Sequence, residues 1–158
     1  AKGRVAEIIE ALQIEKKTAV GQQYTDIKLA GIAGESIALS SLVGKTEFVL
    51  IDFWASWCGP CMKSLPELKA FYDKYKGDKL EILGVSLDDD ENAWKSTVEK
   101  QKLKWKHISD LKGWKCEGAK LYAVNAIPAT VFIDSKGVIL GRNLTIGQME
   151  LIILKTTK

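Results

Sequence analysis

The stretch "EFVLIDFWASWCGPCMKSLPEL", residues 47–68, places two cysteines three positions apart, where an apolar run gives way to a helical pattern. Residues 47–55 are almost continuously apolar, which is typical of a strand buried on both faces. The segment that follows predicts a helix over residues 59–76, bounded by a glycine. Cys58 and Cys61 should therefore lie where a buried strand meets a helix N-terminus.

Two thiols at this spacing could form a metal clip, a static crosslink or an exchangeable redox pair. A structural zinc site needs four ligands, and the chain offers only Cys116 and His107 besides this pair. A static crosslink across so short a loop removes little entropy from the unfolded chain. Redox exchange is therefore the favoured interpretation.

The helix N-terminus favours Cys58 as the attacking sulfur. Unpaired backbone N–H groups and the positive end of the helix dipole both stabilise a thiolate. A thiol with a pKa of about 8.5 is only about 3% ionised at neutral pH, whereas one lowered to about 7 is half ionised. We expect the Cys58 sulfur to meet solvent and Cys61, in the first helical turn, to resolve the mixed disulfide.

Composition indicates one globular domain with no sign of nucleic-acid binding. The 158 residues are 46% hydrophobic and 27% charged, and the net charge is only +3, with acidic and basic residues interspersed. No apolar stretch approaches the roughly 20 residues that a membrane span needs. The chain begins without Met and without a signal-like apolar core, so either a targeting segment has been removed or this is a piece of a longer protein.

The rest of the chain alternates predicted strands and helices. We expect an amphipathic helix over 4–17, a β-hairpin from 24–30 and 36–40, a strand over 79–87, a helix over 88–102 opened by acidic capping residues, a strand over 104–109, a short helix over 116–124, a hairpin over 129–143 turning at 134–137, and a helix over 147–158. This order predicts an α/β domain with a mixed sheet over residues 21–158. Residues 1–20 are expected to form an amphipathic helix or a connector.

In this context "WCGPC" resembles the thioredoxin superfamily, and the resemblance runs from about Gly21 to the C-terminus. The motif "VLIDFWASWCGPC" is similar to the thioredoxin active-site strand, and "NAIPAT" to the loop that carries the family's cis-proline. The N-terminal hairpin and the helix-strand insert after "GVSLDDD" resemble the TlpA-like branch. Its members are cell-envelope, periplasmic thiol-disulfide oxidoreductases related to the redoxin (AhpC-TSA) group. The resemblance implies a thioredoxin-like fold, a redox-active disulfide and no cofactor or metal.

The resemblance also implies roles at single positions around the cysteines. Trp57 matches the active-site tryptophan beside the nucleophile, and Gly59 and Pro60 match the dipeptide between the two cysteines. Ile127 and Pro128 match the cis-proline loop, which lies against the sulfurs and pairs with the substrate backbone. All five are therefore candidate substrate-binding residues.

Asp52 matches the buried aspartate of thioredoxin. Burial should raise its pKa, and the implied task is to take the proton from Cys61. A plainer alternative is that Asp52 faces a polar pocket and only bonds backbone. Many TlpA-like proteins carry a glutamate where this chain has Ser64, and no lysine on the facing strand "LGVSL" matches the one that thioredoxin has opposite the aspartate.

These observations predict a thiol-disulfide oxidoreductase that acts as a reductase of protein disulfides, recharged by an upstream electron donor. The Gly-Pro dipeptide matches thioredoxin, whose reduction potential is about −270 mV. A thiol peroxidase is an alternative, although Ala55 stands where that group has Thr or Ser. A non-catalytic binding module is another, although it would not need both sulfurs. Trp54 and His107 are expected to be structural, and Cys116 to be an inert buried thiol or an incidental surface one.

Overall fold

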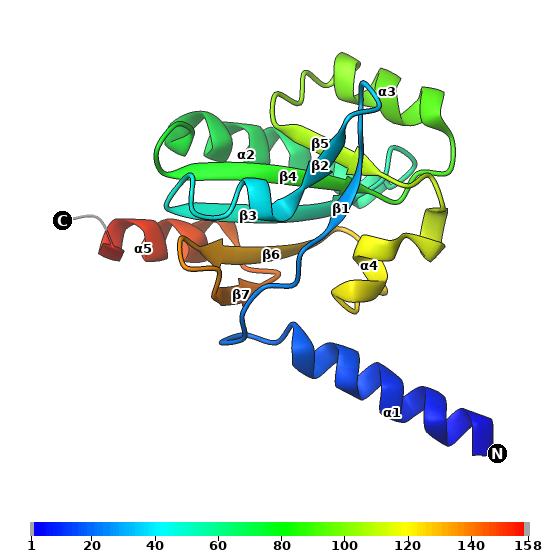
Figure 1. Cartoon of the computed structure of the whole chain (residues 1–158). Coiled ribbons are helices and arrows are strands. Elements are labelled where there is room, and N and C mark those ends of the chain that lie inside the picture. The colour runs from blue at the N-terminus through cyan, green and yellow to red at the C-terminus, as the bar shows by residue number, and fades with distance from the viewer. Residues whose placement is uncertain (1, 157–158) are drawn as a thin grey trace.

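The apolar run before the cysteines forms β3 (Phe48–Trp54), near the centre of a seven-stranded mixed sheet in the computed structural model, which describes residues 2–156 (Figure 1). All of β3 is buried. It pairs in parallel with β4 (Leu80–Ser86) and antiparallel with β6 (Ala129–Asp134). The full strand order is β2-β1-β5-β4-β3-β6-β7, so the α/β prediction is confirmed.

The other predicted elements are present, several of them shorter than expected. They are α1 (Lys2–Lys17), β1 (Lys28–Gly31), β2 (Ser36–Ala38), α2 (Gly59–Tyr75), α3 (Glu91–Lys100), β5 (Lys106–Ser109), α4 (Glu117–Leu121), β7 (Ile139–Arg142) and α5 (Ile146–Thr156). The helix expected over 88–102 loses its first three residues to a loop, because the cap is Asp90, whose side chain accepts from two backbone N–H groups. The end of the helix expected over 147–158 lies outside the described residues.

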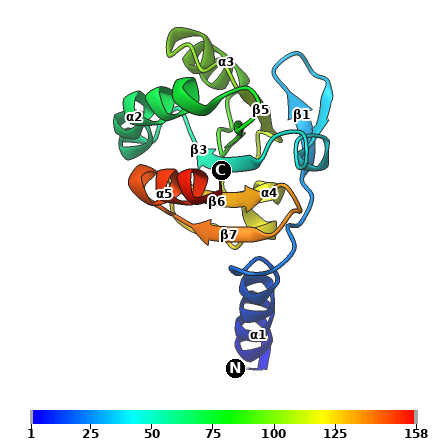
Figure 2. The same cartoon turned by 90° about the vertical axis from the view of Figure 1, so that its left-hand side faces the viewer.

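Helices cover both faces of the sheet. Helices α2 and α5 lie against each other on one face, and α4 lies on the opposite face (Figure 2). Each of α2 and α3 connects two neighbouring parallel strands, since parallel strands need a crossover connection. The carboxyl end of β3 is therefore close to the N-terminus of α2, which is where the cysteines lie.

Helix α1 projects away from the sheet (Figure 1). Its apolar side chains Val5, Ile8, Ile9 and Leu12 are each at least half exposed. The chain attaches to the body just after the helix, where the Arg142 guanidinium donates to Thr18. Within residues 2–156 no helix is both long enough and apolar enough to cross a membrane.

Candidate active site

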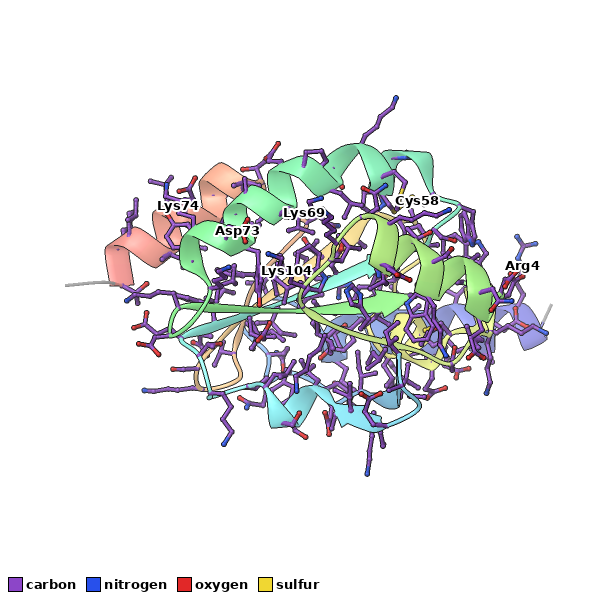
Figure 3. The ribbon with its side chains drawn as sticks, turned by 90° about the horizontal axis from the view of Figure 1, so that it is seen from above. Arg4, Cys58, Lys69, Asp73, Lys74 and Lys104 are labelled. Atoms are coloured by element: carbon purple, nitrogen blue, oxygen red, sulfur yellow. A yellow bond between two sulfur atoms is a disulfide. The ribbon has the colours of Figure 1, made fainter. Side chains whose placement is uncertain are left out.

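Cys58 and Cys61 form a disulfide at the N-terminus of α2. Figure 3 labels Cys58 at this end of the helix. Cys58 is the N-cap, with an extended backbone, and its Sγ accepts a hydrogen bond of 3.2 Å from the Cys61 N–H. Pro60 lies in the first turn, where its missing N–H loses no helical bond. The predicted junction of buried strand and helix start is thus the position of the sulfurs.

The Cys58 sulfur is less open than we expected. The residue is only 5% exposed, and Cys61 is 2% exposed. The loop before β6 covers the disulfide, since the Ile127 carbonyl oxygen lies 3.8 Å from the Cys58 Sγ. Cys58 still lines an open surface pocket of about 440 Å³, whereas Cys61 does not. A partner can therefore approach Cys58 from that pocket.

This pocket, called the disulfide pocket below, is formed by the active-site turn and two other loops. Its lining residues are Trp57, Cys58, Gly59, Pro60, Trp114, Asn125, Ala126 and Ile127. The Ile127–Pro128 peptide bond is cis, as the resemblance implied. The structure thus brings four of the five expected substrate-binding residues to one pocket, and the fifth, Pro128, is adjacent to it in the chain.

Asp52 lies in the middle of β3 and is 5% exposed. Its neighbours across the sheet are Gly84 on β4 and Thr130 on β6, so a glycine occupies the facing position on β4. Among residues 2–156, no group donates a hydrogen bond to its carboxylate. This argues against the alternative that Asp52 serves only to bond the backbone. Burial without a compensating partner raises the pKa of Asp52 from 3.8 to about 7. The carboxyl group can therefore gain or lose a proton near neutral pH.

Asp52 opens into a second cavity, of about 290 Å³, between β3, β6, α2 and α5. Pro128 and Ser64 also line it, so the cavity adjoins both the cis-proline loop and the first turns of α2. The Ser64 hydroxyl donates to the Cys61 carbonyl at 2.9 Å and does not supply the acid group that the TlpA-like branch carries there. Asp52 and Glu67 are the two acidic residues that line this cavity, and only Asp52 was singled out from the sequence.

Asp88 is a buried residue of the site that was not singled out from the sequence. The three aspartates at 88–90 predict helix capping, yet the cap is Asp90, and Asp88 is 1% exposed just beyond the end of β4. Its carboxylate accepts from the Ser56 N–H at 3.1 Å, from the Ser56 hydroxyl and from the Ser86 hydroxyl at 2.6 Å. Asp88 thus fixes the turn that leads into the cysteines. Its role could not be recognised in the run of three aspartates, because an aspartate before a helix usually indicates a cap.

Trp114 was not singled out from the sequence as a site residue. It is 50% exposed and lies beside Trp57, with ring centroids 6.1 Å apart. More than fifty residues separate the two in the sequence, so spacing could not reveal the contact.

The remaining singled-out residues lie in the core. Trp54 is buried, and so is Cys116, the pKa of whose thiol is raised by burial. His107 is buried with its Nε2 3.3 Å from the Leu103 carbonyl, and burial lowers its pKa from 6.5 to about 4. No group of three or more His, Cys, Asp or Glu side chains within residues 2–156 is placed to hold a metal ion.

Comparison with known proteins agrees with this arrangement. The AhpC/TSA family model matches residues 20–142. The thiol-disulfide oxidoreductase ResA of Bacillus cereus is 33% identical over 123 residues, covering 78% of this chain and 68% of the relative. The thioredoxin-like protein YneN of Bacillus subtilis is 32% identical over 132 residues, covering 82% and 72%.

A solved structure gives the same result for the fold. The C-terminal domain of a putative thiol-disulfide oxidoreductase from Bacteroides thetaiotaomicron superposes with a TM-score of 0.79 at 34% identity, covering 88% of this chain and 99% of that domain. The match therefore includes both the sheet and the helices around it.

Proposed function

The chain belongs to the AhpC/TSA family and is a thiol-disulfide oxidoreductase, and we propose that it reduces protein disulfides through Cys58 and Cys61. The observation that carries the proposal is the asymmetry of the pair. Cys58 lines the disulfide pocket and caps α2, whereas Cys61 lies behind it in the first helical turn. The first cysteine is placed to meet a partner and the second to complete the exchange.

The exchange has two steps. In the reduced protein the Cys58 thiolate attacks one sulfur of the partner's disulfide, forming a mixed disulfide, and the other partner sulfur leaves as a thiolate. Cys61 then loses its proton and attacks the Cys58 Sγ, which releases the second partner thiol. The partner gains two electrons and two protons, and the Cys58–Cys61 pair becomes the disulfide seen in the structure.

Asp52 is the proposed proton acceptor for the second step. A carboxyl group with a pKa of about 7 is partly ionised at neutral pH and can take a proton from a thiol. Its position supports this role, since its cavity adjoins Ser64, one turn beyond Cys61, and Pro128 of the loop over the sulfurs. Ile127 and Pro128 are proposed to present backbone to the substrate beside Cys58.

Equilibration with glutathione buffers tests the direction of the reaction. Tryptophan fluorescence should report the redox state, because Trp57 adjoins the disulfide. A reductase should give a midpoint near the thioredoxin value of about −270 mV, whereas a value near −180 mV, typical of an isomerase, would contradict it. In parallel the wild type should cleave insulin disulfides, and the Cys58→Ser variant should not.

A thiol peroxidase is the second candidate, favoured by the family match itself. Against it, the position three residues before Cys58 is Ala55, which is fully buried and has no hydroxyl to bind a peroxide. Peroxide consumption that survives the Cys61→Ser change would support this candidate in place of the reductase.

Two further proposals concern location and neighbours. The similarity of the hairpin and insert to the TlpA-like branch supports a cell-envelope location, with protein disulfides and an upstream electron donor as partners. Labelling of Cys58 in intact cells by a membrane-impermeant maleimide would test the location. The exposed face of α1, and the match to a relative's C-terminal domain, support a connector to an upstream module.

A further inference from the structure

Two half-exposed tryptophans lie side by side next to the disulfide. Trp57 is 53% exposed and Trp114 is 50% exposed, and their rings are tilted by 52° with centroids 6.1 Å apart. Both line the disulfide pocket together with Cys58. Large aromatic side chains kept in water at a reactive site are typical of a binding surface.

Hydrogen bonds hold the loop that carries Trp114, which includes a one-turn 3₁₀ helix, η2 (Gly113–Lys115). The Gly113 N–H donates to the Asp88 carbonyl oxygen at 3.4 Å, and Gly113 has a positive φ of 58°. The Ser109 hydroxyl donates to the Ser86 carbonyl and accepts from the Leu111 N–H, both at 3.0 Å. The loop is thus tied to the end of β4 at Ser109 and at Gly113, both of which precede Trp114.

The same aspartate holds the other tryptophan's turn. The Asp88 carboxylate accepts from both the backbone and the hydroxyl of Ser56, the residue before Trp57. One buried residue therefore anchors the segments that carry Trp57 and Trp114. The pair is preorganised, so binding a partner there requires little ordering of the loops.

The chemistry of the disulfide pocket indicates what it binds. None of its eight lining residues carries a charge, and most of them are aromatic or aliphatic. A small charged disulfide would find no ion pair there. A polypeptide with an apolar residue next to its disulfide could pack that side chain against both tryptophan rings while a sulfur of the disulfide meets Cys58.

We propose that Trp57 and Trp114 form an aromatic platform that selects polypeptide disulfides with an apolar residue next to the reacting cysteine. The inference rests on the proposed reductase function and adds a specificity-determining residue, Trp114, from a loop remote in sequence. Trp57, next to Cys58 in the chain, contacts the apolar side chain of the substrate. Trp114, which lines the same pocket, enlarges this contact.

The test compares two disulfide peptides that differ only in the residue beside the cysteine, leucine in one and serine in the other. Stopped-flow fluorescence of the reduced full chain gives the second-order rate constant for each peptide. The wild type should prefer the leucine peptide, and Trp114→Ala should lower the leucine-to-serine ratio about tenfold, as expected for truncation of an interface tryptophan. The Trp114→Phe variant, which keeps an aromatic ring, should retain most of the preference.

Two outcomes would overturn the inference. An unchanged ratio in Trp114→Ala would show that the ring does not contact the partner side chain. A wild type without preference for leucine would show that the platform does not select apolar residues. If the reduced wild type reacted with neither peptide, the proposed reductase function itself would fail, which is a different result from a lost preference.

Discussion

Replacing Asp52 with asparagine should stabilise the folded protein at neutral and alkaline pH while slowing its chemistry. The pKa of Asp52 is about 7 in the fold against an ordinary value of 3.8, because the carboxylate is buried without a partner. The difference is roughly three pKa units, and at about 1.4 kcal/mol per unit the folded state loses up to about 4 kcal/mol when Asp52 ionises. Asparagine has nearly the same volume and never ionises.

The sign of the pH dependence follows from proton binding. Between pH 3.8 and pH 7 the folded state holds a proton on Asp52 that the unfolded chain has lost, so this group makes stability fall as pH rises. The advantage of Asp52→Asn over the wild type should be near zero at pH 3.8 and below. It should grow through this interval and level off at about 4 kcal/mol above pH 7.

Urea denaturation of the oxidised protein at a series of pH values measures this difference. The exposed Asp78 provides a matched control, since Asp78→Asn should give no comparable change. In single-turnover experiments the mixed disulfide should persist about a hundredfold longer in Asp52→Asn, the scale of a lost general base. A stability difference that is the same at pH 4 and pH 8 would refute the reasoning, because it would mean that Asp52 does not titrate between them.

Three other predictions concern the stability of the fold. Gly84→Ala should lower the free energy of unfolding by about 1–3 kcal/mol in urea, because its Cβ would lie 2.6 Å from His107 Nδ1; an unchanged midpoint would contradict this. The pKa of His107 is about 4 in the fold and 6.5 when free, so its contribution is lost as pH falls from 6.5 towards 4. Over that interval the free energy of unfolding of His107→Gln should therefore fall by about 3 kcal/mol less than that of the wild type. An equal fall in both proteins, measured by urea titration, would count against a neutral buried imidazole. Deleting residues 1–17 should leave the melting temperature within about 2 °C, since nearly all the described side chains of α1 are exposed, and a large drop would show that α1 packs on the domain.

The sequence predicts best those features that depend on the order of residues along one short segment. The continuous apolar run of β3, followed by Pro60 in the first turn of a helix, predicts a buried strand and a helix start without any tertiary information. The pKa of Asp52 was predicted to rise for the same reason, because a carboxylate within such a run has to be buried.

The missed features depend on contacts between distant segments. Trp114 meets Trp57 only because two loops reach the same pocket. Asp88 and Asp90 are chemically identical and lie two residues apart. The path of the chain after β4 buries the Asp88 side chain and leaves the Asp90 side chain to cap α3. The low exposure of Cys58 likewise arises from the cis-proline loop, some seventy residues away. Periodicity and spacing carry no signal for such contacts.

Trapping the mixed disulfide tests most directly whether Cys58 attacks and Cys61 resolves. The reduced Cys61→Ser variant, mixed with a peptide disulfide, should accumulate a covalent adduct that peptide mapping by mass spectrometry places on Cys58. The reduced Cys58→Ser variant should form far less, because Cys61 does not line the disulfide pocket. Adducts forming equally fast on both variants, or faster on Cys61, would contradict the account.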